Sequence, residues 1–119
     1  MIPSGSYTVS DKGTFPDYLK AVGYSGDVVV FTVDVIHDGD RFTINEKHGD
    51  RVKSTTFTVG EEFDEIIMGK PVPSMASIDN DVLTIKNGDT TKTYNVTPTG
   101  LEILYKAPKG SGTLIFKKD

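Results

Sequence analysis

Thr14–Asp27, with the sequence TFPDYLKAVGYSGD, is the one stretch of the chain whose residue pattern is not that of strands and turns. Its apolar side chains recur at the i, i+3, i+4 and i+7 spacing that places them on one face of a helix. These residues are Phe15, Tyr18, Leu19 and Val22. The pattern predicts a short amphipathic helix that caps the rest of the fold with its apolar face.

Both ends of this helix carry termination signals. Thr14 and Asp17 have the spacing of a capping box, and Pro16 falls in the first turn, where its missing N–H costs little. Gly23 stands where a left-handed residue commonly ends a helix. Beyond it, Tyr24–Asp27 could begin a second helix, whereas the β-branched run that follows predicts a strand.

Short runs rich in Val, Ile, Thr, Tyr and Phe fill the rest of the chain, separated by turn signals at regular intervals. This pattern is typical of an antiparallel all-β barrel or sandwich. Asp38 with Gly39, and Asn87 with Gly88, predict hairpins, the second of type I′, and Pro108–Gly112 predicts the last turn. We predict ten strands in up-and-down order, with the helix after the first: Gly5–Ser10, Val28–His37, Arg41–Lys47, Arg51–Val59, Glu62–Met68, Pro71–Ile78, Val82–Lys86, Thr90–Val96, Leu101–Lys106 and Thr113–Lys117.

Closure of such a sheet into a barrel removes the exposed edges that invite aggregation. About eight strands suffice for side chains to fill a barrel, so ten strands imply an internal cavity. We assign both polar and apolar residues to the inward faces of the strands. The polar ones are Ser54, Thr56, Thr91 and Thr93, and the apolar ones are Leu101, Ile103 and Tyr105.

Composition limits the class of protein. A chain of 119 residues is long enough for one domain, residues 1–119, and too short for two. The net charge of −4 with scattered lysines gives no basic patch for nucleic acid, and the absence of cysteine removes disulfides and thiolate metal sites. No secretion signal or apolar run of spanning length is visible, so we expect a soluble, cytoplasmic protein.

Two stretches of the sequence resemble the intracellular lipid-binding proteins, the family of fatty-acid-, retinoid- and bile-acid-binding proteins. The first follows the family's amino-terminal signature through Gly5, Tyr7, Val9 and the four apolar helix residues, although Thr14 and Pro16 depart from it. The second is Phe57–Glu65 (FTVGEEFDE), similar to the family's fourth strand and the gap that follows it.

The resemblance implies a flattened, calycin-like ten-strand barrel with a helix-turn-helix lid and a cavity for one or two lipids. It implies a non-enzymatic carrier that needs no cofactor, with Phe57 at the portal rim and Phe15, Tyr18 and Leu19 facing the cavity from the lid. We expect a monomer. Lys12 and Lys20 are candidates for transient membrane contact during ligand transfer, against the plainer interpretation as solubilising lysines.

Two departures from the family bear on the ligand. Where fatty-acid-binding members place two arginines and a tyrosine around the carboxylate, this chain has Tyr94 (or Asn95 in a register shifted by one), Leu114 and Phe116. Without these hydrogen bonds, of about 1.5–3 kcal/mol each, a neutral or amphipathic ligand, or an acid with its head at the portal, is favoured. The segment between Gly23 and Asp38 is also about two helical turns short, which predicts a reduced lid.

Plainer interpretations apply to the other polar residues. His37 and His48 are expected to be solvated surface residues, and the acidic run from Glu61 to Glu65 a solvated strand edge. No Ser or Cys lies in a nucleophile motif and no metal-ligand spacing occurs, so we predict neither enzyme activity nor a metal site. The alternative function is a structural, interaction or engineered scaffold, in which Tyr94, Leu114 and Phe116 fill the barrel.

Overall fold

A computed structural model describes residues 4–23, 31–67, 70–80 and 82–119 of the chain. Over these residues the chain forms ten β-strands and one short helix, α1, which follows the first strand. Their bounds are β1 Gly5–Asp11, α1 Phe15–Ala21, β2 Thr32–Asp38, β3 Arg41–His48, β4 Arg51–Thr58, β5 Glu62–Ile67, β6 Lys70–Asp79, β7 Val82–Asn87, β8 Thr90–Thr97, β9 Gly100–Ala107 and β10 Gly110–Lys118.

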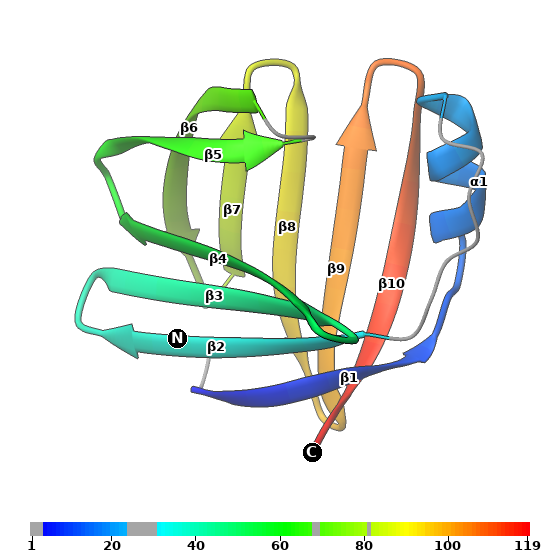
Figure 1. Cartoon of the computed structure of the whole chain (residues 1–119), viewed down its shortest axis with the longest axis horizontal. Coiled ribbons are helices and arrows are strands. Elements are labelled where there is room, and N and C mark those ends of the chain that lie inside the picture. The colour runs from blue at the N-terminus through cyan, green and yellow to red at the C-terminus, as the bar shows by residue number, and fades with distance from the viewer. Residues whose placement is uncertain (1–3, 24–30, 68–69, 81) are drawn as a thin grey trace.

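The strands form one antiparallel sheet in the order β4-β3-β2-β1-β10-β9-β8-β7-β6-β5. Except for β4 and β5, strands that follow each other in the chain pair with each other. Because β1 also pairs with β10, the sheet curls into a barrel that is open only between β4 and β5 (Figure 1). The predicted all-β, up-and-down barrel with a helical cap between its first two strands is therefore confirmed. The prediction for residues 24–30 lies outside the described part of the chain.

The turns of the β2–β3 and β7–β8 hairpins lie one residue later in the chain than predicted. Asp38 pairs with Arg41 and Asn87 with Thr90, so the two-residue loops begin at Gly39 and Gly88. Both glycines have a φ of 60°, whereas the aspartates that follow them have no positive φ. A positive φ at the first loop position alone fits a type II′ turn, so the type I′ prediction was wrong.

Helix α1 lies against β10, at the right of Figure 1. A Cβ atom on Gly112 would lie 2.5 Å from the Cβ of Tyr18, and one on Gly110 would lie 2.8 Å from the Cβ of Ala21. These glycines, predicted as part of a turn, belong to β10, and their lack of side chains lets the helix approach the strand.

The first turn of α1 is attached to β10 by a hydrogen bond in place of the predicted capping box. The backbone N–H of Thr113 donates to the Thr14 hydroxyl at 3.0 Å, and Thr14 makes no side-chain bond to its own helix. The predicted left-handed residue at the other end is confirmed, because Gly23 has a φ of 93°. The helix is therefore held to the barrel through β10.

The core lies inside the barrel, and Phe15 of the helix packs against it. Tyr94, Ile103, Leu114 and Phe116 are all buried in it. A stack of three aromatic rings lies across the gap between β4 and β5. Phe57 stacks on Phe42 at a centroid distance of 5.6 Å and on Phe63 of β5 at 4.9 Å. Apolar packing thus closes the barrel where no backbone ladder does.

Substitution of Gly112 by alanine should weaken the docking of α1. The added methyl group would overlap Tyr18 and the backbone of Thr14, so we expect a loss of about 1–3 kcal/mol in the free energy of unfolding, measured by urea denaturation. Ser111→Ala, at the exposed neighbouring position, is the matched control and should change stability by less than about 0.5 kcal/mol. Equal effects of the two substitutions would contradict this account of the helix contact.

Candidate functional site

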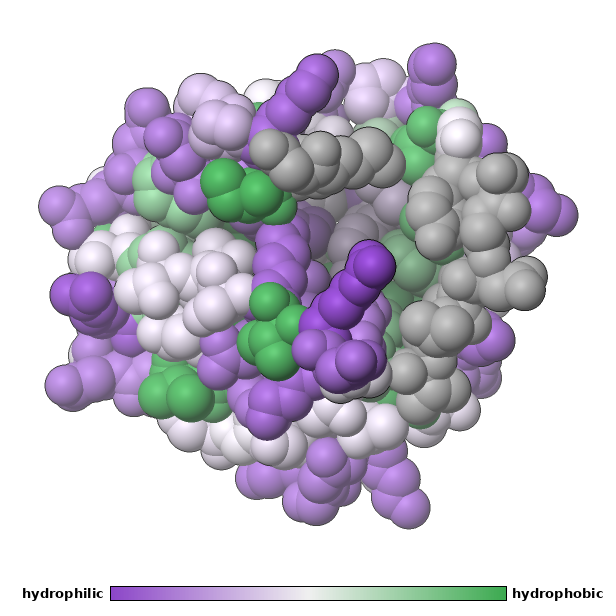
Figure 2. Space-filling view, in the orientation of Figure 1, coloured by the Kyte–Doolittle hydropathy of each residue, from purple (hydrophilic) through white to green (hydrophobic). Residues whose placement is uncertain are grey.

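A cavity of about 280 Å³ lies between α1 and the adjoining end of the barrel. Figure 2 shows the molecule hollowed to the right of centre, with green apolar atoms deep in the hollow and purple hydrophilic side chains beside it. Apolar and aromatic residues form one part of the wall: Phe15, Tyr18, Leu19, Val22, Phe31 and Tyr105. Polar residues form the other: Glu46, His48, Lys53, Glu65, Asn87, Thr90 and Lys92.

Aromatic rings join the helix to the barrel along the apolar wall. Tyr105 of β9 contacts Phe15 at a centroid distance of 4.7 Å and Tyr18 at 5.6 Å. Phe31 stacks on His48 at 4.4 Å. Burial raises the pKa of the Tyr18 hydroxyl and raises that of Tyr105 well above its ordinary value. Both phenols therefore stay neutral at physiological pH.

The polar wall contains a buried ion pair. The Lys92 ammonium lies 2.6 Å from Oε1 and 2.7 Å from Oε2 of Glu65, and the two side chains are 10% and 1% exposed. Lys53, at the more open side, lies 3.9 Å from Glu65 Oε2 and 4.0 Å from Glu46 Oε2. Two lysines and two glutamates thus face one cavity, and their charges cancel.

Asn87, another residue of this wall, has a buried acceptor without a partner among the described residues. Its side-chain amide donates to the Ser74 hydroxyl, which itself donates to the carbonyl of Val72 at 2.8 Å. This chain of donors fixes the orientation of the amide, with Nδ2 toward Ser74. The carbonyl oxygen Oδ1 is buried and accepts no hydrogen bond from the described residues.

Known proteins share both the sequence pattern and the fold. The liver fatty acid-binding protein of Mus musculus is 28% identical over 105 residues, which cover 73% of this chain and 83% of that protein. The liver fatty acid-binding protein of Sus scrofa is 28% identical over 85 residues, which cover 66% of this chain and 67% of that protein. No protein-family model matches the chain. The predicted resemblance to the intracellular lipid-binding family is confirmed.

Solved structures of this family have the same fold. The REP1-NXSQ fatty acid transporter superposes with a TM-score of 0.89 at 23% identity, over 98% of this chain and 95% of that one. Human cRBP IV gives 0.87 at 24% identity, over 100% and 99% of the two chains. Zebrafish ileal bile acid-binding protein complexed with cholic acid gives 0.82 at 21% identity, over 98% and 96%.

Only some of the predicted ligand-binding residues line the cavity. The four helix residues and Tyr105 do so. Five others belong to the buried core instead: Phe57, Tyr94, Ile103, Leu114 and Phe116.

The predicted inward positions on β4 were wrong. Ser54 and Thr56 are exposed, and the alternate residues Lys53 and Phe57 point inward. The same one-residue error affects β8, where Thr90 and Lys92 line the cavity in place of Thr91 and Thr93. Strands have a side-chain period of two, so a one-residue error exchanges the two faces of the sheet.

Several cavity residues were not predicted. Glu65 is buried and paired, not solvated, although the rest of the acidic run is exposed, and His48 contacts Phe31 at the cavity wall. The position of Phe63 indicates that the side chain of Glu65 points inward. Because Phe63 packs against the core from β5, Glu65, two residues later, must face the same way.

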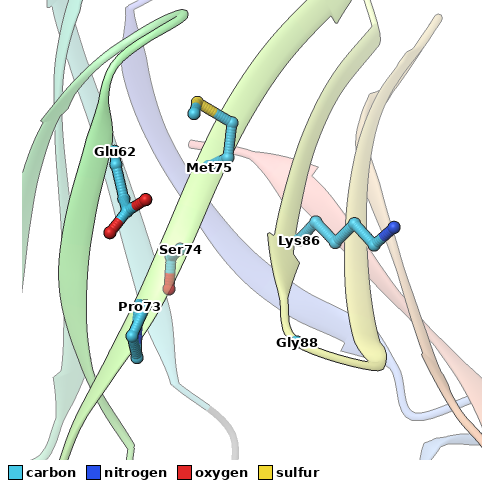
Figure 3. Close-up of a pocket in the computed structure, with 6 residues that line it drawn as sticks. All are labelled: Glu62, Pro73, Ser74, Met75, Lys86 and Gly88. Atoms are coloured by element: carbon cyan, nitrogen blue, oxygen red, sulfur yellow. The ribbon is translucent and has the colours of Figure 1, made fainter.

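A second recess, of about 250 Å³, lies between β5, β6 and the β7–β8 hairpin. Figure 3 shows its charged side chains on different strands, with Lys86 directed away from Glu62. The polar groups therefore do not converge there as they do in the cavity. Within the described residues, no cluster of three or more His, Asp or Glu could hold a metal ion. None of the helices described there has the length and apolar character needed to cross a membrane.

The Glu65–Lys92 pair should show strong coupling in a double-mutant cycle. Glu65→Leu would leave the Lys92 ammonium buried without its carboxylate, so we expect a loss of about 3–5 kcal/mol in the free energy of unfolding. Adding Lys92→Met removes the unpaired charge and should restore most of that loss.

Chemical denaturation of the two single variants and the double variant measures the coupling. Glu62→Leu, at an exposed position of the same strand, is the matched control and should change stability by less than about 0.5 kcal/mol. Additive losses in the double variant would show that the two charges do not depend on each other.

Proposed function

We propose that the chain is a cytoplasmic, non-enzymatic carrier that binds one small hydrophobic molecule in the cavity beneath α1. The observation that supports this most directly is the cavity itself, with the apolar face of α1, Phe31 and Tyr105 along its wall. Burial of apolar ligand surface there would contribute about 25 cal/mol per Å² before the costs of association. The names of the two curated relatives, both fatty acid-binding proteins, support the same class of ligand.

The packed core limits the size of the ligand. A volume of about 280 Å³ is close to the lower end of the range of roughly 300–1,000 Å³ typical of ligand pockets. Tyr94, Leu114 and Phe116 belong to the buried core and do not line the cavity. We therefore propose a compact lipid or the tail of a larger one, held without the deep carboxylate anchor of fatty-acid carriers.

A scaffold with little ligand binding is the second candidate. The buried core favours it, because Tyr94, Leu114 and Phe116 take up space inside the barrel. The two proposals differ in one measurable property, which is saturable binding inside the cavity. The carrier proposal also includes two further properties. The protein is a monomer, and the exposed Lys12 and Lys20 contact a membrane during transfer of the ligand.

Obstruction of the cavity distinguishes these functions. Thr90→Phe places a large side chain at the cavity wall, whereas Thr91→Phe places the same ring on the other face of the same strand. The uncharged fluorescent probe N-phenyl-1-naphthylamine should bind the unmodified protein saturably. We expect at least about tenfold weaker binding to the Thr90 variant, equivalent to about 1.4 kcal/mol, and little change for the Thr91 variant.

Fluorescence titration of the three proteins gives the dissociation constants, and thermal denaturation shows whether each variant is folded. Absence of saturable binding to the unmodified protein would favour the scaffold. Equal weakening by both substitutions would place the bound probe outside the cavity.

A further inference from the structure

We propose that the free edge of β5 is a docking site for an extended, basic segment of a partner protein, which adds to the sheet as a further strand. The segment would bind the backbone and the outward side chains of β5 and not the cavity beneath α1. The inference therefore goes beyond the proposed carrier function. It follows from the direction of the β5 backbone groups, the space beside them and the charge of the exposed side chains.

The backbone of β5 is paired on one side only, because β6 is its single neighbour in the sheet. The carbonyl oxygen of Ala76 in β6 accepts a hydrogen bond at 3.0 Å from the N–H of Gly60, just before β5. Backbone groups alternate in direction along an antiparallel strand, so Ser74 also directs its N–H and C=O toward β5. The partner of Ser74 in register is Phe63. The backbone bonds to β6 therefore come from Phe63 and every second residue after it.

The alternate residues of β5, which are Glu62, Asp64 and Ile66, direct their backbone groups away from β6 and into the gap. The register agrees with this direction, since Pro71 and Pro73, which have no N–H, lie opposite Ile66 and Asp64. No backbone hydrogen bond across the gap is recorded for these three residues among the described parts of the chain. Such a row of unused donors and acceptors is the template to which an extended peptide adds.

Space for an added strand lies beside this edge. The stack of Phe57 and Phe63 spans the gap, and another recess of about 250 Å³ lies against it, between Thr56 of β4 and Glu62 of β5. The two strands diverge from the turn that joins them (Figure 1). The edge of β5 is thus next to open space at Glu62, where one end of the added strand would lie.

The exposed side chains along this edge are acidic. Glu61, Glu62 and Asp64 are exposed, and no ion pair of their carboxylates is recorded among the described residues. Lys86 is directed away from Glu62 (Figure 3), and Arg41 is the one cation that lines the recess in the gap. A net negative charge therefore remains along β5, and it attracts a basic strand and repels an acidic one.

Ile66 adds an apolar contact at the other end of the edge, because its side chain is 50% exposed. An antiparallel added strand would meet Ile66, Asp64 and Glu62 in that order. The sequence that fits is therefore an apolar residue followed, at every second position, by two basic residues. A second copy of β5 fits poorly, since antiparallel pairing centred on Asp64 would place the two Asp64 carboxylates opposite each other.

The test is a titration of the unmodified protein with the blocked peptide Thr-Val-Thr-Lys-Thr-Lys-Thr, followed by two-dimensional NMR. The matched control peptide has glutamate in place of both lysines. We expect the basic peptide to bind at least about fivefold more tightly, because the two cross-strand charge pairs change from attractive to repulsive. The backbone amides of Glu62, Asp64 and Ile66 should become protected from hydrogen exchange, whereas the amide of Phe63 is already paired with β6.

Two substitutions in the protein test the residue assignment. Asp64→Asn should weaken binding of the basic peptide about two- to fivefold, the value of one cross-strand charge pair. Asp50→Asn removes the same charge at an exposed position of the β3–β4 turn and should leave binding unchanged. Ile66→Pro removes an N–H that points into the gap and spares the bonds to β6, so it should weaken binding at least about fivefold.

A modified peptide tests the backbone contact if the Ile66 variant does not fold. Methylation of the backbone nitrogen of the central lysine removes the donor to Asp64 and should weaken binding at least about fivefold. Methylation of the threonine before it, whose N–H points away from β5, is the matched control and should weaken binding less.

Several results would overturn the proposal. They are absence of saturable binding up to about 1 mM peptide, equal binding of the basic and acidic peptides, and protection of amides on β4 in place of β5. A dimer of the free protein in light scattering that is lost in the Ile66 variant would show that a second copy occupies the edge. Binding of N-phenyl-1-naphthylamine in the cavity is measured separately, so each of these results leaves the carrier function standing.

Discussion

The pairing of β1 with β10 is the constraint on which the rest of the structure depends. It joins the two ends of the chain, closes the sheet into a barrel and leaves the single gap between β4 and β5. Because the chain passes from β1 directly into α1, this pairing also sets the helix beside β10, where Gly110 and Gly112 permit close contact. The position of the cavity beneath α1 follows from the same arrangement.

Local patterns were sufficient to predict most of the fold. Apolar spacing from Phe15 to Val22 located the helix, and β-branched runs between turn residues located the strands, since both signals depend on neighbours in the chain. The roles of Gly110 and Gly112 could not be predicted in this way. A glycine beside a hairpin turn satisfies local turn chemistry, whereas its contact with Tyr18 or Ala21 exists only after the barrel has closed.

The candidate site was harder to predict because it depends on which face each strand turns inward. Tyr105 and the helix residues were placed correctly by their apolar character. Ser54 and Thr56 were not, although Phe57 on the same strand is buried and the period of two then turns both of them outward. Charged residues such as Glu65 and Lys92 are rarely buried, so the sequence favours a solvated position until the partner strand brings the opposite charge within reach.

The buried pair costs desolvation energy, and a packed apolar pair of similar volume would often be as stable or more so. A gain in stability therefore does not explain why the protein contains this pair. Its position in the cavity wall is the better explanation. With Lys92 compensated by Glu65, the polar wall offers directional hydrogen bonds but little net charge. In the proposed carrier, such a wall would distinguish ligands by the donors and acceptors of their head groups, whereas the apolar wall formed by α1 and Tyr105 would accept any chain that fits. The proposal thus assigns affinity and selectivity to opposite sides of one cavity.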